Sequence, residues 1–87
     1  MKNWQNWALP DIVFIKLFST LKRFARGGKT QFTLDWHPGM QARDILDTLK
    51  IPGTTERVIL VNGRYSEPEK QIAANDTIVL FPPMTGG

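Results

Sequence analysis

The fold of this chain is decided by the stretch Ile12-Val13-Phe14-Ile15-Lys16-Leu17-Phe18, which is rich in β-branched and aromatic residues. Such a stretch is too short for a confident helix and predicts a β-strand. Successive side chains of a strand point to opposite faces of the sheet. If Val13, Ile15 and Leu17 face the core, then Phe14, Lys16 and Phe18 face outward.

A second apolar stretch, Thr77-Ile78-Val79-Leu80-Phe81, predicts the last strand. These two stretches are the most apolar of the chain, so we expect them at the centre of the sheet, paired in parallel. If Ile78 and Leu80 face the core, then Thr77, Val79 and Phe81 face outward.

The segment between the first strand and Trp36 predicts a short helix and a second strand. Ser19 is the expected N-cap of the helix, and Gly27-Gly28 is expected to end it. Residues 30–36 then place Phe32, Leu34 and Trp36 on one side with polar residues between them. This alternation predicts a half-buried strand that pairs with the first one.

The main helix is predicted by apolar residues at i, i+3, i+4 and i+7, namely Ala42, Ile45, Leu46 and Leu49. We expect Ile51-Pro52-Gly53 to end it, because a residue before proline is pushed away from helical angles.

Strands are next predicted at residues 57–61 and 64–66, joined by a tight turn at Asn62-Gly63. Residues 67–74 are expected to be irregular. The order predicts an α+β fold in which a mixed sheet of about five strands packs on one main helix. We divide the chain into an extension (1–10), a domain (11–81) and a flexible tail (82–87).

Size and composition bound the function. The chain has 87 residues, of which 41% are hydrophobic and 22% charged, and it contains no cysteine. A single domain of this size has little room for a deep cleft, so we expect a module that docks onto a larger partner rather than an enzyme. There is no thiolate metal site, no membrane span and no signal-peptide h-region, and a cytoplasmic location is expected.

Basic residues gather in one part of the chain. From Ile12 to Leu34 there is no acidic residue, whereas five basic ones occur there, Lys16, Lys22, Arg23, Arg26 and Lys29. Nucleic-acid binding is one interpretation, but the little aromatic interleaving favours a solvated face. His37 stands alone without cysteine or a second histidine, so no metal site is expected and His37 is read as a loop residue.

The last six residues, Pro82-Pro83-Met84-Thr85-Gly86-Gly87, point to function. Pro82-Pro83 favours the extended polyproline II conformation and would hold the tail away from the domain. Gly86-Gly87 has no Cβ atoms, so its backbone can pass through a narrow channel. The Gly87 carboxylate would be activated as an acyl-adenylate and then converted to a thiocarboxylate or captured by a lysine amine. A ragged terminus is the alternative.

These residues resemble the MoaD/ThiS sulfur carriers, which are ubiquitin-like β-grasp proteins, and most closely the small subunits of molybdopterin synthases. The likeness covers about residues 12–87. It rests on the Phe81–Gly87 ending, on Val61-Asn62-Gly63, on Asn75–Leu80 and on the helix at residues 42–49. Asn75 and Tyr65 depart from the family pattern, and asparagine tolerates the left-handed conformation that a glycine would adopt.

The resemblance implies a cycle of activation and transfer. An adenylating enzyme would activate Gly87 with ATP and Mg²⁺, a sulfur donor would form the thiocarboxylate, and the large subunit of molybdopterin synthase would receive the tail. Catalytic side chains would belong to these partners, and the carrier itself would bind no cofactor, metal, nucleic acid or membrane. Family members dock through an apolar patch beside the tail, whose positions fall on Phe18, Tyr65 and Phe81.

Three other functions stay open. Gly87 could form isopeptide bonds with target lysines in a protein modifier. The same tail could also donate sulfur to thiamin or to thiolated tRNA. A plain interaction domain with an inert tail is the remaining interpretation.

Overall fold

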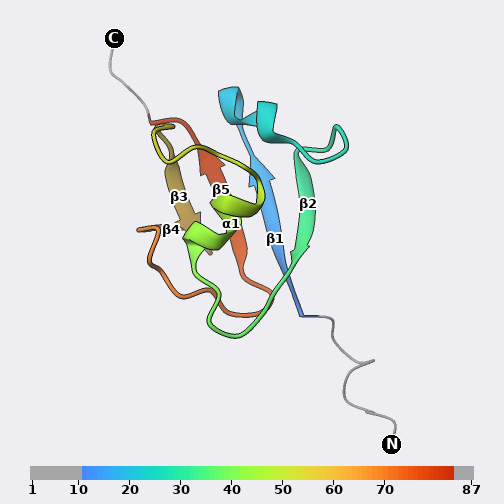
Figure 1. The fold of residues 1–87 in the computed structure, drawn as a ribbon, viewed down its shortest axis with the longest axis vertical. Helices are drawn as coiled ribbons and strands as arrows, with labels where there is room; N and C mark the ends of the chain where they lie inside the picture. The colour runs from blue at the N-terminus through green and yellow to red at the C-terminus, as the bar shows by residue number, and fades with distance from the viewer. Residues whose placement is uncertain (1–10, 84–87) are drawn as a thin grey trace, which may run out of the picture.

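The computed structural model describes residues 11–83, so the predicted extension and residues 84–87 of the predicted tail lie outside the described residues. It contains one mixed sheet whose five strands are, in chain order, β1 (Ile12–Leu17), β2 (Gln31–Asp35), β3 (Val58–Val61), β4 (Arg64–Ser66) and β5 (Thr77–Phe81). Their order across the sheet is β2-β1-β5-β3-β4 (Figure 1).

The pairing of β1 with β5 is parallel, as the sequence predicts, and Ile15 stands opposite Ile78. The other neighbours are antiparallel: β2 with β1, and β3 with both β5 and β4. Because β1 and β5 run in the same direction, the start of β1 and the end of β5 lie at opposite ends of the sheet (Figure 1). The predicted tail therefore follows β5 at the end of the sheet remote from Asp11.

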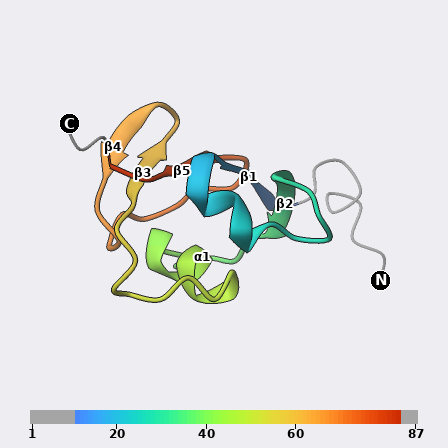
Figure 2. The same ribbon diagram turned by 90° about the horizontal axis from the view of Figure 1, so that it is seen from above.

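The core lies between the sheet and α1 (Ala42–Thr48), which covers one face of the sheet (Figure 2). The residues expected to face inward do so, since Val13, Ile15 and Leu17 are at most 2% exposed. Phe32 and Leu34 of β2, and Trp36 just after it, pack against the core as their alternation predicts. The resulting α+β arrangement of a five-strand mixed sheet on one main helix is the β-grasp fold. In residues 11–83 no helix has the length and apolar character needed to cross a membrane.

The prediction of Ser19 as a helix N-cap is wrong. The short helix η2 (Ser19–Phe24) is a 3₁₀ helix, its cap residue is Phe18, and no side chain caps it. The physical reason is that Phe18 continues the strand ladder, donating its backbone N–H to the Leu80 carbonyl at 3.0 Å. The chain therefore turns sharply at Ser19, whose φ is 56°. Leu21, 1% exposed, anchors η2 in the core.

The main helix also ends earlier than the sequence predicts. Lys50 takes a left-handed conformation with φ of 61°. Its N–H donates to the Asp47 carbonyl, and the Ile51 N–H donates to the Leu46 carbonyl at 2.9 Å. These two bonds form a Schellman motif, which satisfies carbonyls at the end of a helix. The helix therefore ends through the left-handed Lys50 together with Ile51, the first residue of the predicted Ile51-Pro52-Gly53 stop.

Two other local predictions are confirmed. Asn62 and Gly63 both have positive φ, 53° and 85°, in the turn between β3 and β4. Such a turn matches the right-handed twist of a hairpin. Asn75 has a φ of 70°, which is the left-handed conformation expected for it.

Candidate functional site

The candidate site begins where β5 ends. Phe81, the last residue of β5, stands opposite Val58 of β3. Pro82 and Pro83 follow and belong to no strand, because proline has no N–H to donate to the ladder. Both prolines are half-buried. The sheet thus delivers the chain to Pro82 at one end of a central strand, and Met84, Thr85, Gly86 and Gly87 lie outside the described residues.

The face of the sheet opposite α1 is apolar at this end. Strand register places Phe18 next to the end of β5, and it places Val58 directly opposite Phe81. A second row crosses the sheet, in which Leu60 stands opposite both Val79 and Tyr65. We call this surface the outer-face patch; it consists of Phe18, Val58, Leu60, Tyr65, Val79 and Phe81.

The members of the outer-face patch differ in exposure. Tyr65 is 80% exposed and Phe18 is 45% exposed, whereas the other four are half-buried. Strand parity predicts that Phe81 faces outward, but its side chain is only half exposed. The reason is that β5 lies between β1 and β3, whose side chains flank it. No described element covers this face in residues 11–83, as Figure 2 shows. A contiguous exposed apolar surface usually marks an interaction site.

The structure brings two of the three predicted docking residues into adjacent positions and separates the third. Phe18 and Phe81 lie on neighbouring strands at the tail end. Tyr65 lies on the edge strand β4, and it is connected to them through Leu60 and Val79.

The sequence prediction missed Val58 and Leu60 as parts of this surface. The signal was present, since β3 alternates between half-buried and buried residues and its outward positions are these two. Strand parity applied to residues 57–61 would have found them. Val79 was expected to face outward and does so, half-buried in β5.

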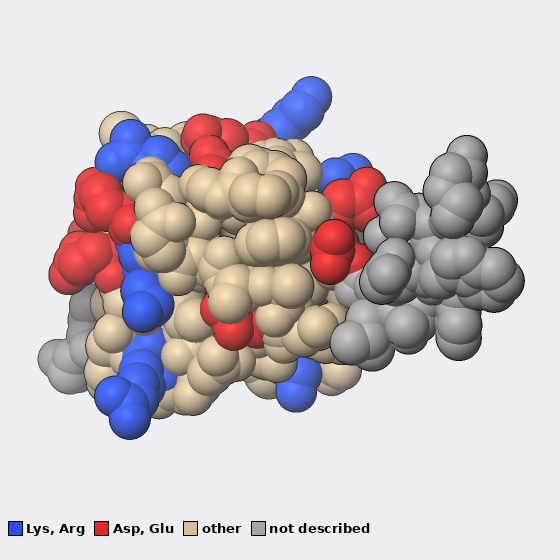
Figure 3. All heavy atoms as spheres, turned by 90° about the horizontal axis from the view of Figure 1, so that it is seen from below, with Lys and Arg blue, Asp and Glu red and all other residues tan. Residues whose placement is uncertain are grey.

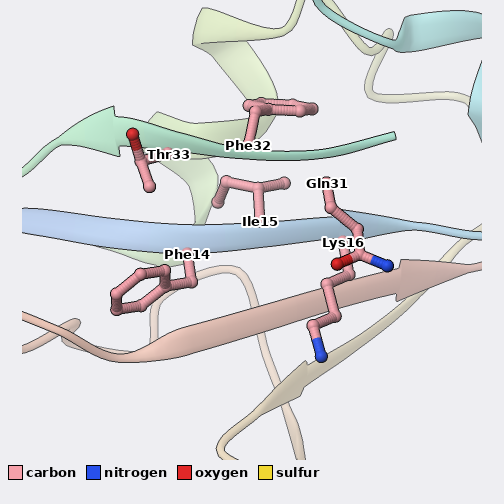
Figure 4. A pocket seen from close by; sticks show the side chains of 6 residues that line it. All are labelled: Phe14, Ile15, Lys16, Gln31, Phe32 and Thr33. Carbon is pink, nitrogen blue, oxygen red and sulfur yellow. The ribbon is translucent and has the colours of Figure 1, made fainter. Parts of the chain in front are cut away.

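A hollow of about 240 Å³ is lined by residues of β1 and β2 (Figure 4). Phe14 and Lys16 point to one side of β1 there, and Ile15 points to the other. Lys16 is the only titratable residue among those that line it. A catalytic site for acid and base chemistry needs at least a positioned proton donor or acceptor with a partner, and this hollow brings no such pair together.

Polar side chains elsewhere in the described part make exposed contacts. Arg43 and Glu69 form an exposed ion pair at 2.7 Å, which contributes little to stability. His37 is exposed, as expected for a loop residue, with Nδ1 3.0 Å from the Pro38 carbonyl oxygen. Residues 11–83 contain no cluster of three histidine or acidic residues that could hold a metal ion.

Comparison with known proteins gives a consistent picture. The family model described as the ThiS family matches residues 15–87. No curated protein matches the sequence.

Three solved structures are similar to this chain. SAMP1 from Haloferax volcanii is 27% identical with a TM-score of 0.71, covering 87% of this chain and 99% of its own. A Pyrococcus furiosus protein, provisionally described as subunit 1 of a molybdopterin converting factor, is 22% identical with a TM-score of 0.70, covering 84% and 98%. Ubiquitin from Caldiarchaeum subterraneum is 19% identical with a TM-score of 0.54, covering 91% and 100%. The last two likenesses show the fold, which is ubiquitin-like.

Proposed function

The chain belongs to the ThiS family, and from this premise we propose that it is a sulfur carrier for molybdopterin synthesis, acting as the small subunit of the synthase through a thiocarboxylate on Gly87. Carriers of this family are small non-catalytic proteins that bind no cofactor and are activated by an E1-like adenylating enzyme. The observation that supports the proposal best is the position of Pro82, at the end of a central strand and beside the outer-face patch.

The chemistry assigns different roles to carrier and partner. A carboxylate is a poor electrophile, so Gly87 would first attack the α-phosphorus of ATP and release pyrophosphate. A sulfide-level donor would then attack the acyl carbon, with AMP as the leaving group, to give the thiocarboxylate. Glycine suits both steps, because a residue without Cβ leaves the carbonyl carbon unhindered and lets the backbone enter a narrow channel. ATP and Mg²⁺ would be held by the adenylating enzyme.

The outer-face patch is the proposed docking surface for the activating enzyme and for the large synthase subunit. Phe18, Tyr65 and Phe81 are its aromatic members. Aromatic side chains dominate the energetics of many interfaces because they bury a large area with few rotatable bonds. Pro82, Pro83, Met84, Thr85 and Gly86 would form the segment that enters the partner's site.

A second candidate function is protein modification, in which a lysine amine of a target protein captures the activated Gly87. The likeness to SAMP1, a small archaeal modifier protein, favours it. Both functions need the same adenylate, and they differ in the nucleophile that attacks it. Sulfur donation to thiamin or tRNA would use the same thiocarboxylate with another acceptor.

Mass spectrometry of the native protein tests the proposal. Replacement of one carboxylate oxygen by sulfur adds about 16 Da, and fragmentation would place this mass on Gly87. Co-purification with a pterin synthase subunit would assign the molybdopterin branch. Protein ladders that disappear on deletion of Gly87, without any thiocarboxylate, would instead establish the modifier function. A chain that continues beyond Gly87 in the mature protein would contradict both.

A further inference from the structure

Four exposed cations lie in η2 and in the turn that leads from it to β2, at the end of the sheet where β5 ends (Figure 1). They are Lys22 and Arg23 of η2 and Arg26 and Lys29 of the following turn, and together we call them the basic flank. η2 contacts both β1 and β5. Its cap residue Phe18 is hydrogen-bonded to Leu80, one residue before the end of β5. The basic flank therefore adjoins the outer-face patch at the end of the sheet where the tail begins.

The turn within the basic flank holds two like charges opposite each other. Arg26 and Lys29 exchange backbone hydrogen bonds of 3.2 and 2.9 Å, closing a two-residue turn over Gly27-Gly28. Both glycines have positive φ, 57° and 78°, which this kind of turn requires. Like charges directly opposite each other across such a pair are destabilising. The isolated domain gains nothing from this arrangement, but an acidic surface brought against it would relieve the repulsion.

Within residues 11–83 the cations of the basic flank form no ion pair, although Asp35 lines the same hollow as Arg26. The ion pair found in residues 11–83 joins Arg43 to Glu69, and it does not involve the basic flank. The end of the sheet away from the tail differs, since basic and acidic side chains lie next to each other there (Figure 3). The four cations of the basic flank follow one another in the chain within residues 12–34, where no acidic residue occurs.

Apolar surroundings favour a protein as the partner over a nucleic acid. Proteins that bind single strands combine cations with exposed aromatic rings on which bases stack. The aromatic ring between the cations of the basic flank is that of Phe24, which packs against the core. The Arg23 guanidinium lies 4.8 Å from the centroid of this ring, so the ring is not free to stack on a base. The exposed aromatic residue next to the flank is Phe18, which belongs to the outer-face patch. Cations at the rim of an apolar patch are the usual anatomy of a protein interface.

We propose that the basic flank binds an acidic surface of the E1-like adenylating enzyme that activates the tail, and that it speeds association and orients the tail toward that enzyme's active site. The proposal rests on the carrier function proposed above. Charges at the rim of an interface act mainly on the association rate, because they attract the partner before contact. The effect falls with ionic strength, since exposed charges are screened by salt.

The first test compares two double variants of the full chain. Lys22→Glu with Arg26→Glu reverses two charges of the flank, and Arg64→Glu with Lys70→Glu reverses two exposed charges at the other end of the sheet. Association with the E1-like adenylating enzyme of the same organism is followed by stopped-flow fluorescence. We expect the flank variant to associate about tenfold more slowly at low salt, with the difference lost at high salt. Equal rates for both variants would overturn the proposal.

A second measurement is independent of the carrier chemistry. NMR titration of the wild-type chain with a glutamate decapeptide should shift the amide signals of residues 18–30, and the flank variant should lose these shifts. Shifts spread evenly over the surface would contradict the proposal even where the thiocarboxylate is found. An oligouridylate that binds the flank at least tenfold more tightly than the peptide would contradict it in favour of nucleic acid. Absence of the thiocarboxylate would instead refute the proposed function, and the flank would still be judged by this titration.

Discussion

The backbone N–H of Phe18 donates to the carbonyl of Leu80 at 3.0 Å, which joins the start of η2 to the end of the central strand β5. One residue later, Phe81 completes the strand, and Pro82 then ends the ladder because it has no N–H. This hydrogen bond brings the aromatic ring of Phe18 and the cations of η2 to the point where the chain leaves the sheet. Phe18 of the outer-face patch and Pro82 therefore lie at the same end of the sheet.

The proposed chemistry depends on the position of the terminal carboxylate. Deletion of Gly87, or addition of one serine after it, is expected to abolish adenylation and thiocarboxylation, because the reacting carbon moves by about 3.5 Å. The unfolding temperature should stay unchanged, since the domain's core lies within residues 13–80. ATP-dependent pyrophosphate release measures the first effect and thermal unfolding the second. Full activity of either variant would refute the tail mechanism.

Phe18 and Phe14 form a matched pair for testing the docking surface. Both are exposed phenylalanines on the outward side of the same stretch, 45% and 40% exposed, but only Phe18 lies at the tail end. Phe18→Ala is expected to weaken binding of the adenylating enzyme by at least about tenfold, as truncation of an aromatic anchor does. Phe14→Ala should change it by less than about twofold. Isothermal titration calorimetry gives both values, and equal effects would place the docking surface elsewhere.

Lys50 offers a stabilising substitution. It occupies the left-handed position that ends α1, with φ of 61°, where glycine has no steric penalty. Lys50→Gly is expected to raise the free energy of unfolding by about 0.5–1 kcal/mol, because the cost of the left-handed conformation for a residue with a Cβ exceeds the added entropy of the unfolded chain. Lys50→Ala, which keeps the Cβ, is the control and should bring no such gain. Urea unfolding measures both variants, and a destabilised glycine variant would contradict the role of the Schellman motif.

Asp76 connects the loop before β5 to the turn after β3. Its carboxylate accepts hydrogen bonds of 2.8 Å from the Asn62 side-chain amide and from the Ala73 backbone N–H. Asp76→Ala removes both, and because both bonds are exposed and water can replace the carboxylate, we expect a loss of about 0.5–1.5 kcal/mol in the free energy of unfolding. Asp47→Ala is the control, because that exposed residue lies on α1 away from this network. Urea unfolding measures both variants. If Asp76→Ala lost no more stability than Asp47→Ala, the network would not stabilise the fold.

Much of the fold is determined by the sequence through local patterns. The alternation of residues in 12–18 and 77–81 predicts which side chains face the core, because side chains of a strand alternate between the two faces of the sheet. The stripe of Ala42, Ile45, Leu46 and Leu49 located the main helix in the same way. Asn62-Gly63 predicted its turn because both residues tolerate positive φ. Each of these signals lies within a few residues, so the sequence alone carries it.

Only the tertiary structure decided which segments meet. Phe18 stays in the ladder because β5 offers it the Leu80 carbonyl, and that distant acceptor moved the turn to Ser19 and removed its predicted capping role. The pairing of β3 with β5 and β4 placed Val58 opposite Phe81 and Leu60 opposite Tyr65, which extended the outer-face patch beyond the residues predicted from the sequence. Parity assigns a residue to a face of the sheet, whereas its neighbours on that face depend on hydrogen bonds between strands far apart in the chain. The sequence alone therefore indicated the proposed carrier tail, and the packing of β1, η2 and β5 determined which residues lie at the end of β5 where it begins.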